Sequence, residues 1–313
     1  MIFSTDLNDY INHCKQYYEN LRREAEGQTE NLTRIVVRSL AYGLIKPEYG
    51  KWLNLCLAVQ NWQELNNLIF QTTRHSFIPG CPAECDHSFY LGGCLNALAC
   101  GDYSSIERAL PYELDLSQNG SLFDMIGVNM LMTLWYKDET FSDQTLPTAQ
   151  KFILSKKNHW ERAVISYMVS LYYGECFSAG TALQQVCELY KLQNKDKYRK
   201  QLCIEAHGLY CLARYLLTPR QFQQIPLPVC KNFSPDYALW RLRHFQPELN
   251  LYFEYPSPME LINKIYLTPI AKSINSQFYP NQRYPYFSTY EKLEWILDHD
   301  CMMEDFLKII NKS

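Results

Sequence analysis

Apolar residues recur at three- and four-residue steps along most of the chain, which is the spacing of one face of an α-helix. The first such face consists of Leu7, Tyr10, Ile11, Cys14, Tyr17, Tyr18, Leu21 and Ala25. Asp6 and Asp9 lie in the first turn of this segment and Gly27 follows its end, an order that suits the helix dipole and a glycine C-cap. The N-terminal segment is therefore predicted to be an amphipathic helix.

Start and stop signals predict further helices. A second apolar face consists of Leu32, Ile35, Val36, Ser39, Leu40 and Leu44, and Pro47 ends it. Asn158–Glu161 and Ser288–Glu291 each place a capping residue three positions before a glutamate. Ser257–Glu260 places a proline at the first helical position. We expect roughly a dozen helices, and no alternating stretch is long enough to predict a strand.

The segment Tyr198–Leu217 predicts the most deeply buried helix. Its only charged residues between Leu202 and Leu217 are Glu205 and Arg214, so it is apolar nearly all round. These two side chains point to opposite sides of the helix and cannot pair with each other. Because an unpaired buried charge is very costly, each is expected to find a partner on a neighbouring helix.

A faint internal repetition predicts helical hairpins. It covers residues 57–69, 98–110 and 171–183. In each stretch an apolar helix end leads into a tight turn with an acidic or amide capping residue, and a second apolar helix follows. The expected capping residues are Asn61, Asp102 and Glu175. The offsets of 41 and 73 residues are irregular, so the pattern favours stacked hairpins without a fixed repeat.

Together these patterns predict an all-α fold of stacked antiparallel helical hairpins, irregular and α-repeat-like, around the buried helix Tyr198–Leu217. Residues 76–88 are expected to be a loop and residues 275–288 an aromatic, proline-rich connection. Both carry large apolar side chains, unlike a flexible linker. We therefore predict one helical domain over residues 1–313, with an N-terminal hairpin at 1–46 and a C-terminal cap at 275–313.

Charge and hydropathy narrow the classes of partner. Hydrophobic residues make up 47% of the chain and charged residues 20%, with a net charge of −3, which is globular composition. A nucleic-acid partner is disfavoured because no basic excess is present. No window reaches the roughly 18 apolar residues of a transmembrane helix, and the first residues lack a signal-peptide pattern. We expect a cytoplasmic protein that does not enter membranes.

The cysteines predict free thiols. The chain has 12 cysteines, but without a secretion signal a reducing compartment is expected. Several lie on apolar helical faces, where a cysteine acts as a small core residue: Cys14, Cys56, Cys187, Cys203 and Cys211.

Cys81, Cys85 and His87 form the sharpest candidate for a metal site. With Cys94 or Cys100 as a fourth ligand they could hold zinc. No second close pair of ligands matches the first, and Cys94 and Cys100 fall on a helix that explains them as core residues. A loop with incidental cysteines is the favoured interpretation, and zinc is a weak alternative.

No catalytic signature is present. The chain lacks a Gly-x-Ser-x-Gly elbow, a His-Glu-x-x-His helix and a phosphate-binding glycine loop. A cysteine–histidine pair could still assemble in the fold, and His207 beside Glu205 is one possibility. On a buried helix, a hydrogen-bonded core histidine is the favoured interpretation. We therefore expect neither an enzyme nor a cofactor.

The connection at 275–288 is the predicted partner-binding segment. Its candidate residues are Tyr279, Arg283, Tyr284, Tyr286 and Phe287. Aromatic residues and arginine are enriched at the hot spots of protein interfaces. The alternative is that these rings close the end of the helical stack, and the sequence leaves both open.

Three stretches carry a resemblance to a known family. They are YLGGCLNALACGDY at 90–103, the helix pair around Leu171–Leu183, and CIEAHGLYCLARYLL at 203–217. Over about residues 30–270 the order of these features resembles the immunity protein 49 family of bacterial polymorphic toxin systems. The resemblance implies an all-α protein that neutralises a cognate toxin encoded next to it, and it implies no particular site residues.

The sequence thus favours an immunity protein that binds a cognate, cytoplasm-acting toxin and neutralises it by steric occlusion. The first alternative is a helical-repeat scaffold that captures peptides in a groove. The second is a zinc-dependent enzyme that uses Cys81, Cys85 and His87.

Overall fold

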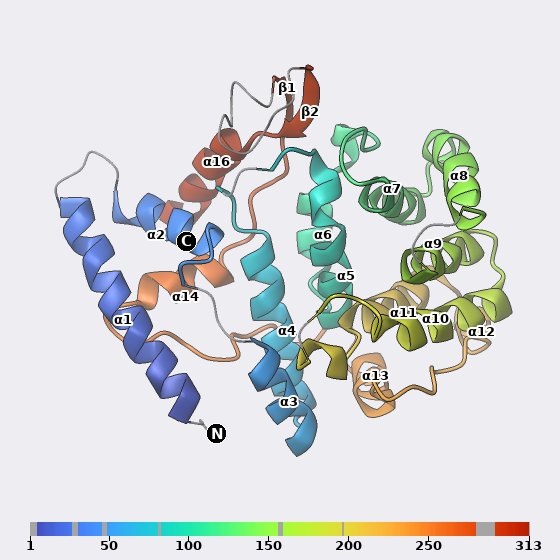
Figure 1. Ribbon diagram of the computed structural model, residues 1–313, viewed down its shortest axis with the longest axis horizontal. Helices are drawn as coiled ribbons and strands as arrows, with labels where there is room; N and C mark the ends of the chain where they lie inside the picture. Colours follow the sequence, from blue (N-terminus) through green and yellow to red (C-terminus); the bar gives the residue numbers. More distant parts are fainter. Residues whose placement is uncertain are drawn as a thin grey trace.

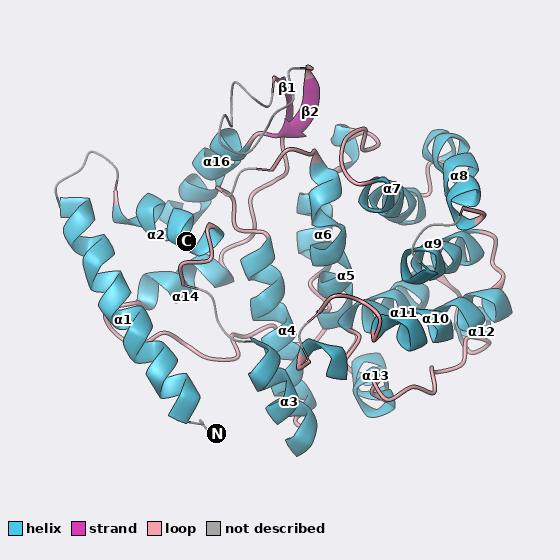
Figure 2. Cartoon of the chain, viewed as in Figure 1, coloured by secondary structure: helices cyan, strands magenta, loops and turns pink. Residues whose placement is uncertain are grey.

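The computed structural model is mostly helical, and the residues that it describes include one small two-stranded sheet (Figures 1 and 2). It describes residues 5–26, 31–45, 49–80, 83–155, 159–195, 197–279 and 292–312. This confirms the predicted all-α fold class. Buried apolar residues from Leu7 in the first helix to Ile310 in the last form one continuous cluster.

The first half of the chain forms α1 (Thr5–Glu26), α2 (Leu32–Ala41), α3 (Tyr49–Val59), α4 (Trp62–Ser76), the 3₁₀ helix η1 (His87–Tyr90), α5 (Leu91–Cys100), α6 (Tyr103–Ala109), η2 (Tyr112–Leu114), α7 (Leu122–Tyr136) and α8 (Glu139–Ile153). The second half forms α9 (His159–Tyr172), α10 (Cys176–Tyr190), η3 (Arg199–Gln201), α11 (Ile204–Leu216), α12 (Pro219–Phe222), α13 (Pro235–Arg243), α14 (Glu260–Leu267), β1 (Asn275–Phe278), β2 (Glu294–Leu297) and α16 (His299–Lys312).

The three predicted hairpins are present as α3–α4, α5–α6 and α9–α10. A residue with positive φ turns the chain in each: Gln60, Gly101 and Gly174. Asn61 caps α4 as expected, because its side chain accepts the N–H of Glu64 at 3.2 Å. Asp102 and Glu175 also occupy the predicted N-cap positions of α6 and α10, but neither side chain accepts a capping hydrogen bond.

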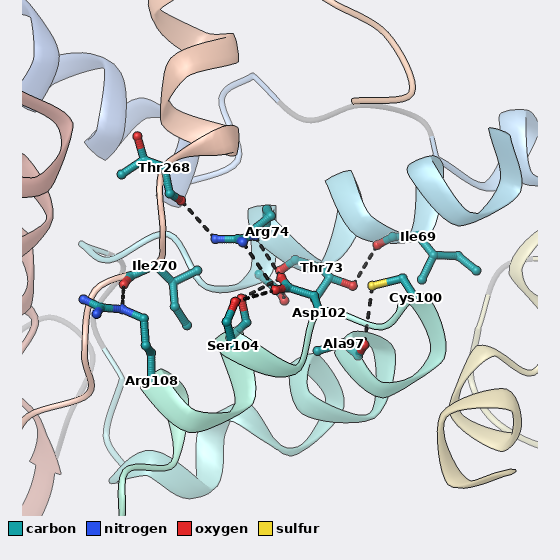
Figure 3. Close-up of polar contacts among 12 residues, drawn as sticks. Ile69, Thr73, Arg74, Ala97, Cys100, Asp102, Ser104, Arg108, Thr268 and Ile270 are labelled. Atoms are coloured by element: carbon teal, nitrogen blue, oxygen red, sulfur yellow. Dashed lines mark hydrogen bonds and ion pairs between the residues drawn. The ribbon is translucent and has the colours of Figure 1, made fainter. Parts of the chain in front are cut away.

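Asp102 is instead one half of a buried ion pair (Figure 3). Its Oδ2 lies 2.9 Å from Nε of Arg74 on α4, and the two side chains are 1% and 9% exposed. Ser105 donates its hydroxyl to the same carboxylate at 2.6 Å. Arg74 also donates to the carbonyl of Thr268, beyond α14, at 3.0 Å. The pair therefore ties α4, the α5–α6 turn and the end of α14 together.

The predicted central helix is present but shorter. Leu202 adopts an extended conformation, and the N–H of Cys203 bonds the carbonyl of Asn232 at 2.7 Å. These contacts separate η3 from α11, so the continuous helix predicted from Tyr198 is wrong at its start. From Glu205 to Ala213 every residue of α11 is buried, which confirms the predicted burial.

Both charged residues of α11 have partners, although these come from connecting segments and not from helices. Lys195, between α10 and η3, forms an ion pair with Glu205. The guanidinium of Arg214 lies 5.4 Å from the ring centre of Phe245, which follows α13. Because a buried charge needs a partner, the two charged residues of this apolar helix lie only at positions that a loop can reach.

Gly208 lets α11 lie directly against α5. A Cβ atom built at Gly208 would stand 2.0 Å from the carbonyl oxygen of Leu95. No side chain fits at that separation, so the two backbones touch only because this position is glycine. On the other side of α11, Tyr167 of α9 donates its hydroxyl to the carbonyl of Leu209 at 2.8 Å.

The C-terminal region differs most from the prediction. β1 and β2 pair antiparallel, with Asn275 opposite Leu297 and Phe278 opposite Glu294. The helix expected from Ser288–Glu291 is wrong, because residues 294–297 are a strand and α16 begins at His299. Residues 288–291 themselves lie outside the described residues. Strands of four residues are too short for alternation to reveal them.

Two further boundaries are corrected. α14 begins at Glu260, so Pro258 does not occupy its first position as predicted. The second helix ends at Ala41, before Leu44. Cys14, Cys56, Cys187, Cys203 and Cys211 are all buried free thiols, which confirms their interpretation as core residues.

We expect Gly208→Ala to destabilise the fold by about 1–3 kcal/mol or more, because the new methyl group must push α11 away from α5. The matched control is Gly92→Ala on α5, where nothing lies within 4 Å of the added Cβ. That variant should be neutral or gain up to about 1 kcal/mol of helix propensity. Urea unfolding measures both free energies, and equal values would refute the close-approach argument.

Asp102→Asn separates a capping role from an ion-pair role. Asn and Asp cap helices about equally well, so a cap alone would make the variant neutral. Loss of the charge that pairs with buried Arg74 should instead cost about 3–5 kcal/mol. The reverse exchange at the true cap, Asn61→Asp, should change the free energy of unfolding by well under that amount.

His207 predicts a loss of stability in acid. Burial lowers its pKa to about 3, whereas an exposed histidine titrates near 6.5. Between these two pKa values, the unfolded chain therefore binds a proton at His207 that the folded chain does not bind. Stability from this residue is present above pH 6.5 and falls by up to about 1.4 kcal/mol per pH unit below it. Unfolding measured from pH 7 to 4 should be less pH-dependent in His207→Gln, and an unchanged slope would contradict this assignment.

Candidate partner-binding surface

Of the five candidate residues in the predicted partner-binding segment, only Tyr279 is described. Tyr279 directly follows β1, and 44% of its surface is exposed. Arg283, Tyr284, Tyr286 and Phe287 lie outside the described residues. The role of this segment in binding a partner stays a prediction, and Tyr279 is its one described candidate residue.

The predicted metal ligands are likewise described in part. Cys81 lies outside the described residues, while Cys85 is half-buried and His87 is completely buried. In the described part of the chain, no three His, Cys, Asp or Glu side chains lie close enough to hold a metal ion. Cys94 and Cys100 are both fully buried in the core cluster, as their helical positions predict.

Asp86 organises the loop that contains these residues. Its buried carboxylate accepts the hydroxyl of Ser117 and the N–H of Gln118, both at 2.7 Å, as well as the N–H of Ser88 at 3.0 Å. His87 forms a 2.7 Å hydrogen bond through Nδ1 with Asn275 of β1. Burial lowers the pKa of His87, and the nearby Asp86 charge opposes that shift. These hydrogen bonds give the loop a structural role, because they connect η1 to residues 117–119 and to β1.

The contacts of His207 also indicate a structural role. Its Nε2 accepts the N–H of Ser234 at 3.2 Å, and its ring stacks on Phe233 with centres 4.0 Å apart. These contacts occupy the ring, and Glu205 is engaged by Lys195. The interpretation as a hydrogen-bonded core histidine is confirmed.

A groove of about 420 Å³ lies where the C-termini of α7, α9 and α11 meet the N-terminus of α8. We call it the helix-end groove; its elements lie together in the green to yellow part of Figure 1. Its apolar walls are Leu134, Leu171, Leu216 and Leu217. Its polar residues are Thr133, Lys137, Asp138, Glu139 and Ser142. An apolar cleft with a few polar groups is the usual composition of a binding site.

Local chain geometry fixes the rim of this groove. Lys137 adopts a left-handed conformation and ends α7, its N–H bonding the carbonyl of Thr133 at 3.0 Å. Asp138 then caps α8 by accepting the N–H of Phe141 at 3.1 Å. Tyr112 donates its hydroxyl to Asp138 at 2.9 Å, and this bond lowers the pKa of the carboxyl group. Asp138 is therefore held in its charged form at the groove.

One exposed aromatic side chain, Tyr172, lines the helix-end groove, and three others belong to residues next to its lining: Tyr173 follows Tyr172, Tyr215 precedes Leu216, and Tyr112 bonds Asp138. Tyr112, Tyr172, Tyr173 and Tyr215 have exposures of 49%, 38%, 50% and 44%. Tyr215 stacks on Trp135 with ring centres 4.5 Å apart and an angle of 3° between the planes. Such pre-positioned rings lose little side-chain entropy on binding, which is why aromatic residues dominate interface hot spots.

The electrostatics of the groove favour a positively charged occupant. Each helix C-terminus carries about half a negative charge, and those of α7, α9 and α11 meet here. Asp138 and Glu139 outweigh Lys137 by one charge. The positive end of α8, which Asp138 caps, offsets only part of this negative charge. A lysine or arginine side chain would gain from both the charge and the exposed rings.

The sequence contained a signal for this surface that the prediction missed. Aromatic residues stand in pairs or singly at helix ends, as Trp135-Tyr136, Tyr172-Tyr173 and Tyr215. Helical periodicity assigns such residues to a helix end without saying which other ends lie nearby. Only packing brings the ends of these helices together at one groove.

Within the described ranges, no helix is both long and apolar enough to cross a membrane. Comparison of the chain with protein-family models, with curated proteins and with solved structures finds no match in any of the three.

Proposed function

We propose that the chain is an immunity protein that binds a cognate, cytoplasm-acting toxin and blocks it sterically. The observation that carries this proposal is the helix-end groove, which combines apolar walls, an exposed aromatic ring at Tyr172 and more acidic than basic side chains. The resemblance in sequence to immunity protein 49 supports the same function. The proposed occupant of the groove is a basic segment of the toxin.

The chemistry of the groove suits a tight, selective complex. A lysine or arginine of the toxin would lie against Asp138 and Glu139, while apolar side chains would cover Leu216 and Leu217. Complementary charge speeds association and rejects wrong partners, and buried aromatic anchors slow dissociation. A partner bound here would be blocked by the bulk of the surrounding helices, so no catalytic residue is required.

A helical-repeat scaffold that captures a basic peptide is the second candidate. It is favoured by the same groove, which several helix ends form together. The two candidates differ in what they need from the partner. An immunity protein requires a folded toxin encoded beside it, whereas a scaffold would bind the isolated peptide segment with similar affinity.

The proposal predicts rescue of growth when the chain is co-expressed with the toxin encoded by the adjacent gene. The complex should also persist through gel filtration, because immunity requires tight binding. Absence of both rescue and complex would show the proposal to be wrong. Rescue without a stable complex would argue against steric occlusion.

Variants locate the surface. Tyr172→Ala and Glu139→Lys, both at residues that line the helix-end groove, should each weaken toxin binding by about tenfold or more. Tyr42→Ala removes a comparably exposed ring at the end of α2 and serves as the matched control. Tyr279→Ala tests the connection predicted from sequence. A loss of affinity at Tyr279 alone would move the interface to the C-terminal segment and refute the groove.

A further inference from the structure

A second pocket, which we call the polar pocket, lies between α7 and α8 and is bounded by the loop that follows η2. Its volume is about 260 Å³. It lies nearer the N-terminus of α7 and the C-terminal half of α8, two helices that pack against each other in the green part of Figure 1. The described residues that line it are all different from those of the helix-end groove.

The lining of the polar pocket is hydrogen-bonding but almost entirely uncharged. Its hydroxyl and amide groups belong to Ser117, Gln118, Asn129, Gln144, Thr145 and Thr148. An apolar patch that includes Met125 and Ile126 completes the lining, and Asp115 is the one charged side chain among the described lining residues. Hydroxyl and amide groups both donate and accept hydrogen bonds, whereas the carboxylate repels an anion. This composition favours a neutral ligand with several hydroxyl groups and an apolar face.

Thr145 has a buried hydroxyl group without a partner in the protein. The residue is 4% exposed, and its Oγ1 atom forms no hydrogen bond with any described residue. Other buried threonines in helices donate this hydroxyl to the carbonyl four residues earlier, as Thr73 does to Ile69 at 2.7 Å and Thr133 to Asn129 at 2.8 Å. Because buried hydroxyl groups are rarely left unpaired, that of Thr145 is suited to a ligand in the pocket.

The loop that forms one wall of the pocket is fixed in an uncommon conformation. Asp115 has φ of 61° and ψ of −170°, a combination that is almost restricted to glycine. Asn129 of α7 holds the loop, because its side chain accepts the N–H of Ser117 at 2.7 Å and donates to the carbonyl of Ser117 at 3.1 Å. Strained residues persist where surrounding contacts enforce them, and they concentrate at ligand sites. The wall is thus formed before a ligand binds, which lowers the entropy cost of binding.

We propose that the polar pocket binds one neutral hexose. Hydroxyl groups of the sugar would bond Thr145 and the carboxylate of Asp115, and the exposed amides of Gln118 and Gln144 would bond others. The C–H face of the ring would lie on the apolar patch beside Met125. A water molecule occupies about 30 Å³ in the liquid, so the pocket has room for about nine of them, which suits a single sugar ring.

Saturation-transfer NMR of the full chain with D-glucose, D-galactose and D-mannose tests the ligand class. At least one hexose should bind saturably and about tenfold more tightly than glycerol or cyclohexanol, because each of these two lacks part of the match. Glycerol offers hydroxyl groups without a ring, and cyclohexanol offers a ring with a single hydroxyl group. The proposal is overturned if none of the three hexoses saturates, or if glycerol or cyclohexanol binds as tightly.

Thr145→Val tests the position, because it removes the hydroxyl group at nearly constant shape. It should weaken hexose binding by about fivefold, the effect of one hydrogen bond. Since this hydroxyl bonds nothing in the protein, the denaturant midpoint of the variant should stay equal or rise. The matched control Thr73→Val removes a hydroxyl that is bonded within α4, so it should lower the midpoint and leave hexose binding unchanged. An unchanged hexose affinity in Thr145→Val would refute the site.

Asp115→Asn tests the carboxylate separately. It should weaken hexose binding by about fivefold or more, because a neutral amide oxygen accepts a weaker hydrogen bond than a carboxylate does. The variant keeps an Oδ1 atom that can accept the N–H of Leu116, as Asp115 does at 2.8 Å. Asp143→Asn removes the same charge at an exposed position of α8 outside the described lining, and it should not change the affinity. Equal losses in the two variants would contradict a specific contact at Asp115.

Discussion

The close approach of α11 to α5 is the contact on which the arrangement of the other helices depends. Gly208 has no side chain, so the backbone of α11 meets the carbonyl of Leu95 directly. A helix held this deeply buries its whole circumference, and it can carry charge only where a loop reaches it, at Glu205 and at Arg214. The identity of one residue thus sets both the depth of the central helix and the places where it tolerates polarity.

This crossing also determines where binding sites can form. The C-terminal end of α11 emerges beside the ends of α7 and α9, which produces the helix-end groove. Its N-terminal end lies next to α3, α4 and α5, which produces a second, smaller cavity of about 70 Å³. The groove has more acidic than basic side chains, and the helix C-termini that gather there add to its negative charge.

Buried polar residues hold segments that are far apart in the sequence. Arg74 and Asp102 join α4 to the α5–α6 turn and to Thr268. Asp86 accepts the backbone N–H groups of Gln118 and Asn119. Buried Arg241 of α13 donates Nε–H to the carbonyl of Ala99 at 2.8 Å. Apolar contacts permit many arrangements of similar energy, whereas each of these groups is costly unless its particular partners are in place, so they select one arrangement.

The sequence alone determined the fold class, the three hairpins, the burial of α11 and the core position of the cysteines, because helical periodicity records which face of a segment is buried. It predicted capping bonds at Asp102 and Glu175 that are absent, misplaced the start of α16, and overlooked β1 and β2. An acidic residue before a helix looks the same in the sequence whether or not its side chain caps the helix, and a strand of four residues is too short for alternation to reveal it. The helix-end groove and the cavity were decided only by tertiary structure. Periodicity indicates that a face is covered but not by what. Tyr172, Leu216 and Asp138 form one surface only because separate helices end at the same place.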